Sequence, residues 1–304
     1  MYNLKMNPLN KFNSTNVFSL LVEFYSANFT EYGVDKSLGE NLVNLIWQKK
    51  DKFPQESLRK EVKDLFDNVK LQESKTRKEI SLLDLFDLSN VNHFVDVGAN
   101  NLARINEVAR KYPQIAKLTA VDVVPQVKQF KDPVRSTYIQ INPTCTDYPI
   151  KSNSCDFINI EFVLHHFLNE DLIKSQIKTF ERILKPGGKI LLWEESFEES
   201  IDLKNLILNN NKLGIQSNKS LTQNFYKLSQ EEKLEFIIVN DWIINVNLDH
   251  MQWTGQWKDW KTWVSLFESE GFVLEMKSNL GLRVNGRLKQ GVHMLGLFKL
   301  VKEV

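Results

Sequence analysis

The sequence has little cysteine, no long apolar run and almost no net charge. Cys145 and Cys155 are its two cysteines, too few for a disulfide framework in a chain of this length, and they indicate a reducing compartment. No run approaches the roughly 20 apolar residues that a transmembrane helix needs. The first residues also lack the apolar core of a secretory signal peptide. We therefore expect a cytoplasmic protein without a membrane span.

The charges are balanced and evenly spread. Lysine and arginine number 39 and aspartate and glutamate 38, for a formal net charge of +1 over 304 residues. Proteins that bind nucleic acid usually carry a basic patch or stripe, so we expect no nucleic-acid partner. Apolar residues make up 42% and charged residues 25% of the chain, which are the proportions of a globular protein with a sizeable core. The oligomeric state is left open.

The first part of the chain has a helical pattern. Between residues 16 and 86 the apolar residues recur three and four positions apart, as they do on the buried face of an amphipathic helix. Pro54 stands where a helix N-terminus would begin. The pattern predicts three or four helices, which we assign to an N-terminal helical cap over residues 1–88.

From residue 89 the pattern changes to short β-rich runs that alternate with helices. Strands are predicted at 93–98, 117–122, 136–141, 156–160 and 189–193. Between them, 102–112 and 170–184 have the apolar spacing of helices. Alternating strands and helices are typical of βαβ units, which build a mostly parallel sheet with helices on its faces.

The alternation stops after the fifth strand. Residues 196–268 form a predicted helical lid insertion, in which 242–247 could be extended. Two closing strands follow at 272–277 and 292–300, and the connection between them is too short for a long helix, so they could pair as an antiparallel hairpin. Residues 89–304 are thus predicted to be an α/β domain. Its sheet is seven-stranded, mostly parallel and doubly wound, with an antiparallel C-terminal strand.

Two acids stand at the carboxyl ends of predicted strands, where open α/β sheets bind their ligands. Asp96 lies at the end of the first strand, just before Gly98, which lets a ligand approach the backbone without a side chain in the way. A carboxylate at that point attracts a cationic ligand and repels a pyrophosphate. Asp122 ends the second strand, where an acid suits the two ribose hydroxyls of a nucleoside.

Three motifs follow one another in a fixed order: Asp96 to Ala99, Leu164-His165-His166, and Leu184 to Gly188. With these motifs, residues 90–195 and the two closing strands resemble the class I, Rossmann-like S-adenosylmethionine-dependent methyltransferases. The resemblance implies a methyltransferase with S-adenosyl-L-methionine as cofactor. The reaction would be direct displacement, in which an O, N or C nucleophile attacks the methyl carbon in line with the departing sulfur.

The resemblance also implies roles for individual residues. Those expected to contact the cofactor are Asp96, Gly98 and Asn100 along the methionine part, Asp122 at the ribose, Val123 beside the adenine, Thr144 and Cys145 at the adenine edge, and Glu161 and Phe162 facing the sulfonium. Leu102 departs from the family pattern, which usually has a third small residue there. An alternative is therefore a catalytically degenerate binding or scaffold protein that kept the fold and lost turnover.

Three histidines are candidates for the acceptor side: His165, His250 and His293. A general base is needed only if the acceptor must lose a proton, and the near-neutral pKa typical of histidine suits that task. For each of them a packing role competes with the chemical one. In an extended segment His250 and Gln252 would share a face, and together with His293 they could hold a metal, as in carbon-methylating members that act on α-keto acids. Unrelated polar residues are the favoured interpretation, so we predict no metal site.

Another class of enzyme is disfavoured. A nicotinamide dehydrogenase would need its glycine fingerprint at residues 98–103, which lack the glycine that approaches the pyrophosphate. A cap and a lid of this extent suggest a small-molecule acceptor, in specialised metabolism, rather than a flat macromolecular surface. The sequence does not name the acceptor or the atom that is methylated.

Overall fold

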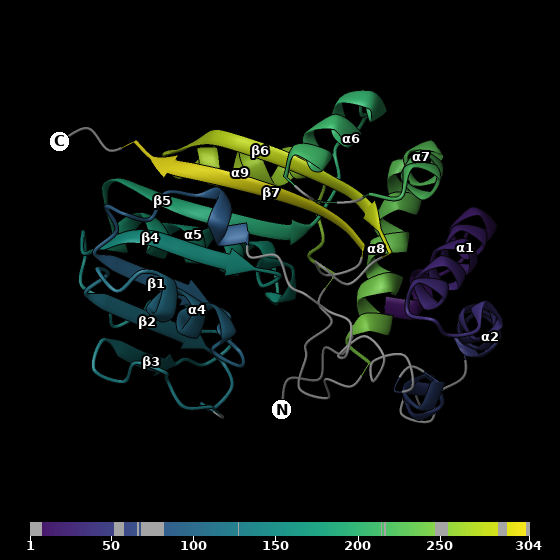
Figure 1. The fold of residues 1–304 in the computed structure, drawn as a ribbon, viewed down its shortest axis with the longest axis horizontal. Helices are drawn as coiled ribbons and strands as arrows, with labels where there is room; N and C mark the ends of the chain where they lie inside the picture. The colour runs from purple at the N-terminus through teal and green to yellow at the C-terminus, as the bar shows by residue number, and fades with distance from the viewer. Residues whose placement is uncertain are drawn as a thin grey trace. The chain divides into compact units, whose positions relative to one another are not determined.

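The computed structural model describes residues 8–51, 58–65, 67, 82–126, 128–213, 215, 217–246, 255–284 and 291–301. Its centre is a seven-stranded sheet with the strand order β3-β2-β1-β4-β5-β7-β6. The strands are β1 (His93–Val97), β2 (Lys117–Asp122), β3 (Ser136–Gln140), β4 (Cys155–Glu161), β5 (Leu184–Glu195), β6 (Phe272–Arg283) and β7 (Gly291–Leu300). The first five are parallel, and β7 runs antiparallel (Figure 1). The predicted fold class is confirmed.

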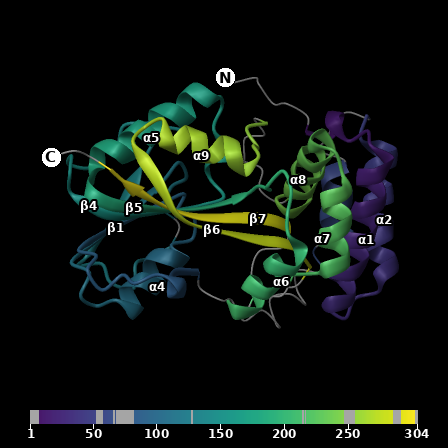
Figure 2. The ribbon, with the colours of Figure 1, turned by 90° about the horizontal axis from the view of Figure 1, so that it is seen from above.

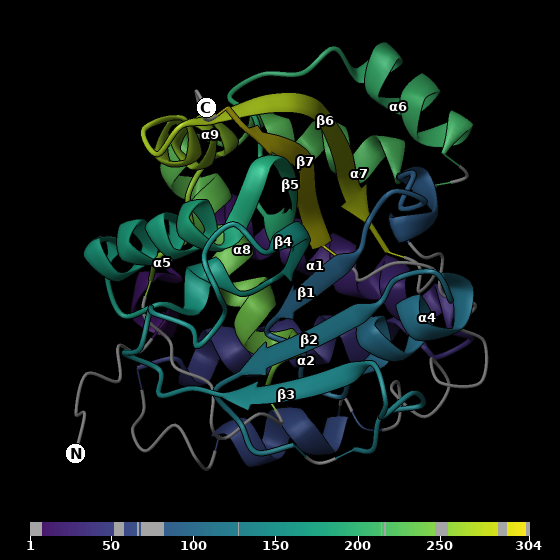
Figure 3. The same ribbon diagram turned by 90° about the vertical axis from the view of Figure 1, so that its left-hand side faces the viewer.

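The inner strands are apolar because both faces of the sheet are covered. All five residues of β1 are buried, as in parallel sheets whose strands lie between two layers of helices. Helix α4 (Ala103–Lys111) covers one face, and helices α5 (Glu170–Ile183) and α9 (Trp260–Glu268) cover the other (Figure 2). Figure 3 shows β2 and β3 side by side and running in the same direction. The carboxyl ends of the parallel strands therefore meet at one edge.

The other helical elements precede the sheet, lie within the predicted insertion or, in one case, follow β4. They are α1 (Thr15–Glu31), α2 (Lys36–Lys49), α6 (Leu203–Lys212), α7 (Lys219–Lys227) and α8 (Gln230–Ile244), together with helical residues 58–65 and the 3-10 turns η1 (Pro8–Lys11), η2 (Leu82–Leu85) and η3 (Leu164–His166). The predicted N-terminal and insertion helices are thus present in the described residues. Pro54 lies outside them. No helix in the described residues is long and apolar enough to cross a bilayer.

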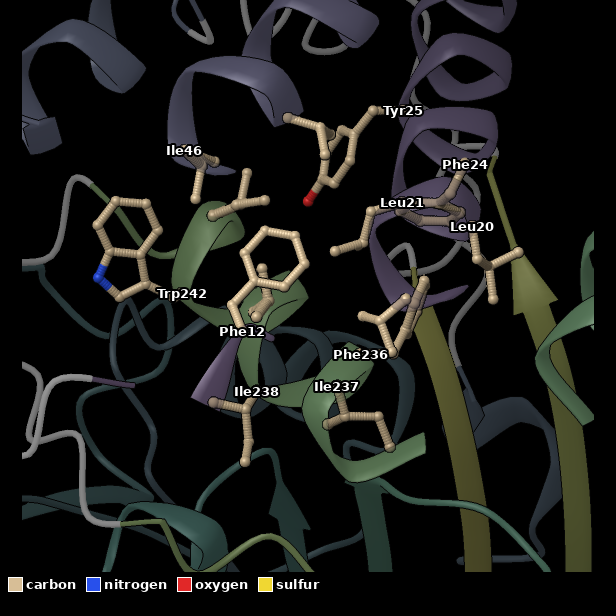
Figure 4. Close-up of a cluster of buried hydrophobic side chains, with 14 of the residues drawn as sticks. Phe12, Leu20, Leu21, Phe24, Tyr25, Ile46, Phe236, Ile237, Ile238 and Trp242 are labelled. Carbon is tan, nitrogen blue, oxygen red and sulfur yellow. The ribbon is translucent and has the colours of Figure 1, made fainter. Parts of the chain in front are cut away.

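The chain forms two compact units. We call Leu83–Glu194, Trp260–Ser278 and Leu295–Val304 the sheet unit, and Met1–Leu82, Glu195–Asp259 and Asn279–Met294 the helical unit. The helical unit joins the N-terminal helices and most of the insertion around an apolar core of their own (Figure 4). In that core Phe24 of α1 packs edge-on against Phe236 of α8, with ring centroids 5.8 Å apart. Burial of one such phenylalanine side chain contributes roughly 1.5–3 kcal/mol to the free energy of unfolding.

Two elements differ from what the sequence indicated. For residues 242–247 the sequence allowed an extended conformation, but Trp242 to Ile244 are the last turn of α8. This helix is buried continuously from Phe236 to Ile243, and a short apolar run buried on all sides does not distinguish helix from strand by periodicity. The strand predicted at 189–193 is longer: β5 begins at Leu184, directly after α5, and its pairing with β4 is irregular near its start.

Candidate functional site

The acids that the sequence singled out lie at one edge of the sheet unit. Asp122 is the last residue of β2 and Glu161 the last residue of β4. Asp96, in β1, is directly opposite Asn159 of β4 in the parallel pairing. Acids from three separate strands are thus brought together by strand order.

The loop after β1 is held in unusual backbone conformations. Gly98, Asn100 and Leu102 have φ angles of 73°, 39° and 62°. A Cβ atom on Gly98 would lie 2.3 Å from Cγ2 of Val163, so only glycine fits there. Left-handed backbone costs roughly 1–3 kcal/mol at a residue other than glycine, and such strain gathers at functional sites. Leu102, the residue that departs from the family pattern, is fully buried, so its bulk fills the core of the sheet unit.

Asp122 holds this loop in place through backbone hydrogen bonds. Its Oδ2 accepts a hydrogen bond from the backbone N–H of Asn100 at 2.6 Å. Its Oδ1 accepts from the N–H groups of Val123 and Val124 at 2.6 and 3.1 Å. An ionised carboxylate offers about four acceptor positions. Three are used by these amides, which leaves capacity for one further donor such as a ribose hydroxyl.

Asp96 is buried, and only one of its two carboxyl oxygens has a hydrogen-bond partner among the described residues. Its Oδ1 accepts from Nδ2 of Asn159 at 2.9 Å. Among the described residues, no partner reaches Oδ2 of Asp96 or Oδ1 of Asn159. Burial raises the pKa of Asp96 to about 7, although the bond from Asn159 lowers it, and nearby Glu161 raises it further. An incoming cation would favour the ionised form of this carboxyl group.

Glu161 already has a cationic neighbour. Its Oε1 accepts from Nε of Arg104 at 2.7 Å and from Nδ2 of Asn159 at 3.1 Å. Nη1 of Arg104 donates to Glu107 at 2.8 Å. Because Arg104 and Glu107 both belong to α4, the two carboxylates hold the guanidinium at the start of that helix, next to the loop after β1.

The residues expected at the adenine lie beyond the ends of β2 and β3. Val123 follows Asp122 directly and is 41% exposed, unusual for a large apolar side chain. Thr144 and Cys145 sit in the turn after β3, where the Thr144 hydroxyl donates to Oδ1 of Asn142 at 2.9 Å and Cys145 Sγ to the Asp147 carbonyl at 3.1 Å. Phe162 follows β4 with a φ of 57°.

The turn after β4 is anchored by an acid that the sequence reasoning missed. Glu194 of β5 is fully buried. Its Oε1 accepts from the N–H groups of Val163 and Leu164 at 3.1 and 2.8 Å. Its Oε2 lies 2.5 Å from Nδ1 of His165, which is also fully buried. A buried carboxylate and a candidate base thus form a hydrogen-bonded pair at the end of β5.

Comparison with known protein families identifies the kind of domain that contains these residues. Residues 95–192 match the model of a family described as a methyltransferase domain. The chain carries a class I S-adenosylmethionine-dependent methyltransferase domain. S-adenosyl-L-methionine is accordingly its methyl donor. No curated protein matches the chain significantly.

Solved methyltransferase structures are similar to this chain at low identity. One from Methanosarcina mazei has 11% identity and a TM-score of 0.44, covering 74% of this chain and 100% of its own. The N-methyltransferase NodS from Bradyrhizobium japonicum has 12% identity and a TM-score of 0.43, covering 72% and 90%. One from Mesorhizobium loti has 11% identity and a TM-score of 0.45, covering 71% and 94%. Similarities this distant say nothing about the acceptor.

The other histidines of the methyltransferase lie elsewhere. His250, like Gln252, lies outside the described residues. His293 is fully buried in the helical unit, where its Nδ1 lies within hydrogen-bonding distance of Nη2 of Arg283 and its Nε2 is 3.8 Å from Oε1 of Glu195. A guanidinium only donates, so Nδ1 accepts and the ring proton is on Nε2. Of the three residues weighed as metal ligands, the structure therefore describes only His293.

The same part of the methyltransferase contains further buried polar groups. The hydroxyl of Tyr25 donates to Oδ1 of Asn240 at 3.0 Å. Burial raises the pKa of Tyr25, and the carboxylates of Glu195 and Asp241 raise it further. The helical unit therefore has a polar centre within its apolar core.

Three site residues were missed, two of them for the same reason. Asn159 and Glu194 are polar residues within apolar, buried strands, whereas Arg104 lies in the first turn of α4, next to the loop after β1. A polar residue inside a continuous apolar run is a usable signal, because a buried polar group needs a partner. Which partner it takes is not readable from the run itself.

Proposed function

We propose that this methyltransferase transfers the methyl group of S-adenosyl-L-methionine to an O, N or C nucleophile of a small-molecule acceptor. The observation that carries the cofactor assignment is the pair of buried acceptor atoms, Oδ2 of Asp96 and Oδ1 of Asn159, which have no partner among the described residues. A buried unsatisfied acceptor is costly and calls for a donor. The cofactor has two cationic groups, its sulfonium and its α-ammonium, and the ammonium can donate hydrogen bonds.

The residues fit such a ligand. Asp122 keeps one acceptor position for a ribose hydroxyl, and exposed Val123 offers an apolar surface for the adenine. Thr144 and Cys145 would meet its edge. The absence of a side chain at Gly98 lets the methionine part pass close to the backbone, with Asn100 beside it. Glu161 and Phe162 would face the sulfonium.

The bound cofactor supplies an activated methyl group. The protein then mainly has to align the acceptor with the methyl carbon and the sulfur, and alignment of this kind can supply roughly 7–11 kcal/mol. The strained loop after β1 and the amide-anchored turn after β4 are suited to this task, since their backbones are held by buried carboxylates.

The small-molecule part of the proposal rests on the additions to the sheet. The cap over residues 1–88 and the lid over 196–268 surround a common apolar core instead of forming separate appendages. Additions that follow the carboxyl ends of the strands usually choose the substrate. We place the choice of acceptor in these segments.

The test is binding, measured by calorimetry and thermal unfolding, of S-adenosylhomocysteine, 5′-methylthioadenosine and NAD. S-adenosylhomocysteine at about 100 times its Kd should stabilise the fold by roughly 2.7 kcal/mol. 5′-methylthioadenosine, which lacks the amino-acid part, should bind more weakly, and NAD should not bind. A folded protein that ignores S-adenosylhomocysteine would contradict the proposal and favour a degenerate scaffold.

A further inference from the structure

We propose that Arg104 is a specificity-determining residue of the cofactor site: it binds the α-carboxylate of the methionine part and makes the enzyme discriminate against sulfonium cofactors that lack this carboxylate. This inference rests on the proposed function and deepens it. It comes from two charged side chains of the sheet unit. Arg104 has N–H donors that no described residue uses, and buried Asp96 has one carboxyl oxygen without a partner among the described residues.

The guanidinium of Arg104 is held at two of its three nitrogens. Its Nε donates to Oε1 of Glu161 at 2.7 Å, and its Nη1 donates to Oε2 of Glu107 at 2.8 Å. Arginine has five N–H donors, and Nη2 donates to no residue in the described parts of the chain. The side chain is 17% exposed. The guanidinium is therefore oriented by two carboxylates and still has donors for a ligand.

A chain of hydrogen bonds joins Arg104 to Asp96. Nδ2 of Asn159 donates to Oδ1 of Asp96 at 2.9 Å and to Oε1 of Glu161 at 3.1 Å, and the same Oε1 accepts from Arg104. Burial raises the pKa of Asp96, and the charge of Arg104 is near enough to lower it in turn. A guanidinium thus lies close to the carboxyl group that we assign to the ammonium of the cofactor.

An α-amino acid matches this arrangement of charges. Its ammonium and its carboxylate are bonded to the same carbon atom, so they need an anionic and a cationic partner close together. Asp96 supplies the first partner, and Arg104 supplies the second, since a guanidinium matches the geometry of a carboxylate. Without Arg104, the carboxylates of Asp96 and Glu161 would repel the carboxylate of the ligand. A ligand with the ammonium alone does not need this arginine.

The backbone beside Arg104 favours an anion as well. Arg104 lies in the first turn of α4, and Leu102, the N-cap residue of that helix, makes no side-chain cap. The N–H of Ala103 donates to Oδ1 of Asn101 at 3.0 Å. The other N–H groups of a first helical turn have no partner within the helix, and the positive end of the helix dipole attracts negative charge. A carboxylate bound by Arg104 would gain from both.

The experiment compares the binding of two ligands by calorimetry. They are S-adenosylhomocysteine and its decarboxylated analogue S-adenosyl-3-thiopropylamine, which keeps the ammonium and lacks the carboxylate. The wild type should bind S-adenosylhomocysteine about 30-fold more tightly than the analogue, the effect of one hydrogen bond between charged groups. In Arg104→Met this ratio should fall to about threefold, because the affinity for S-adenosylhomocysteine drops about tenfold while the affinity for the analogue is retained.

Two further variants make the comparison decisive. Lys111→Met is the matched control, because it removes a cation of the same helix that donates to the same Glu107, at 2.7 Å, and it should keep the wild-type ratio. Arg104→Gln keeps a polar side chain for Glu161 without the charge, so it should behave like Arg104→Met and decides the question if that variant does not fold. An arginine that only supports the fold would weaken both ligands alike, and an unchanged ratio would overturn the proposal.

The two proposals fail differently. If the wild type binds neither ligand, the proposed function fails before Arg104 is considered. If the wild type binds both ligands equally well, or if the Arg104 variants keep the wild-type ratio, the role of Arg104 is wrong and the cofactor assignment stands.

Discussion

Two consecutive glutamates at the end of β5 each lie near a histidine. The two glutamate–histidine pairs differ in the other groups that they contact. Glu194, in the sheet unit, lies 2.5 Å from Nδ1 of His165 and also accepts two backbone amides. Glu195, in the helical unit, is 3.8 Å from Nε2 of His293, whose other nitrogen faces Arg283. Alternate residues of a strand point to opposite faces. Neighbours of identical chemistry therefore have different surroundings: Glu194 bonds to two backbone amides as well as to a histidine, whereas Glu195 lies near a histidine that a guanidinium also contacts.

The largest effect is expected from removing that guanidinium. Arg283→Met would remove the guanidinium that donates to the buried His293, which in turn lies 3.8 Å from Glu195, and breaking a buried charged network in this way costs about 3–5 kcal/mol. The free energy of unfolding, measured in urea, should fall by that amount. Lys189→Met is the control, because Lys189 pairs with Glu275 at a partly exposed site, where ion pairs contribute only about 0.2–1 kcal/mol. Equal losses in the two variants would remove the distinction between the His165 and His293 pairs.

Asp96 sharpens the comparison, because it is a buried acid of the sheet unit whose only hydrogen-bond donor among the described residues is the neutral Asn159. Its pKa is raised from 3.8 to about 7. Between these values the folded protein binds more protons than the unfolded chain, so stability should fall as pH rises, by roughly 4 kcal/mol at most. Asp96→Asn should abolish that loss and be more stable than the wild type at pH 8. It should also weaken the binding of S-adenosylhomocysteine, whose ammonium would lose an ionised partner. A variant no more stable than the wild type at pH 8 would contradict the assignment.

His93 should produce the opposite pH dependence in the same unit. It is buried between the carbonyl of Ser154 and the hydroxyl of Thr119, and burial with nearby Lys117 lowers its pKa from 6.5 to about 4. In that window the unfolded chain binds more protons, so this histidine makes stability rise with pH, by about 1.4 kcal/mol per unit at most. In the wild type, the pH dependence of stability due to His93 opposes the one due to Asp96. Unfolding of Asp96→Asn between pH 4.5 and 6.5 should expose the His93 slope, and a flat profile would contradict it.

The two glutamates can be compared by one substitution. Glu194→Gln disturbs three hydrogen bonds of a buried carboxylate, at about 1–3 kcal/mol for a group left unsatisfied. Glu195→Gln disturbs a longer contact. Urea unfolding should therefore show a greater loss for Glu194→Gln, by about 1 kcal/mol or more. The reverse order would indicate that Glu195, not Glu194, is the better-satisfied acid.

A further prediction concerns cofactor affinity and Asp122. Asp122→Asn keeps the shape of the side chain but removes the charge and part of the capacity to accept hydrogen bonds. The affinity for S-adenosylhomocysteine, measured by calorimetry, should fall about tenfold, equivalent to about 1.4 kcal/mol. The binding of adenine alone should change little, because the proposed contact is with the ribose. An unchanged affinity for S-adenosylhomocysteine would remove Asp122 from the site.

Much of the fold was predictable because helices and strands are indicated by patterns of apolar residues over short stretches of sequence. The alternation of β-rich runs with amphipathic helices located β1 to β5, and the strand predicted at 117–122 is β2 (Lys117–Asp122) itself. The length of β6 was not predictable, because only its first part, 272–277, alternates clearly, whereas Leu280 to Arg283 are buried continuously. The last turn of α8, Trp242 to Ile244, was not recognised as helical for the same reason. Burial on all sides removes the periodicity on which such predictions depend.

The sequence by itself determined the class of the fold and the positions of Asp96, Gly98 and Asp122 at strand ends, because apolar periodicity and glycine requirements act over a few residues. Only the tertiary structure decided the partners. His165 and Glu194 are 29 positions apart and meet because β4 and β5 are neighbours. Glu195 and His293 are separated by almost 100 positions, and Arg283 lies within hydrogen-bonding distance of the same histidine from ten positions before it. Hydrogen bonds and charges act between groups that packing brings within a few ångströms, and no local pattern records which groups those will be.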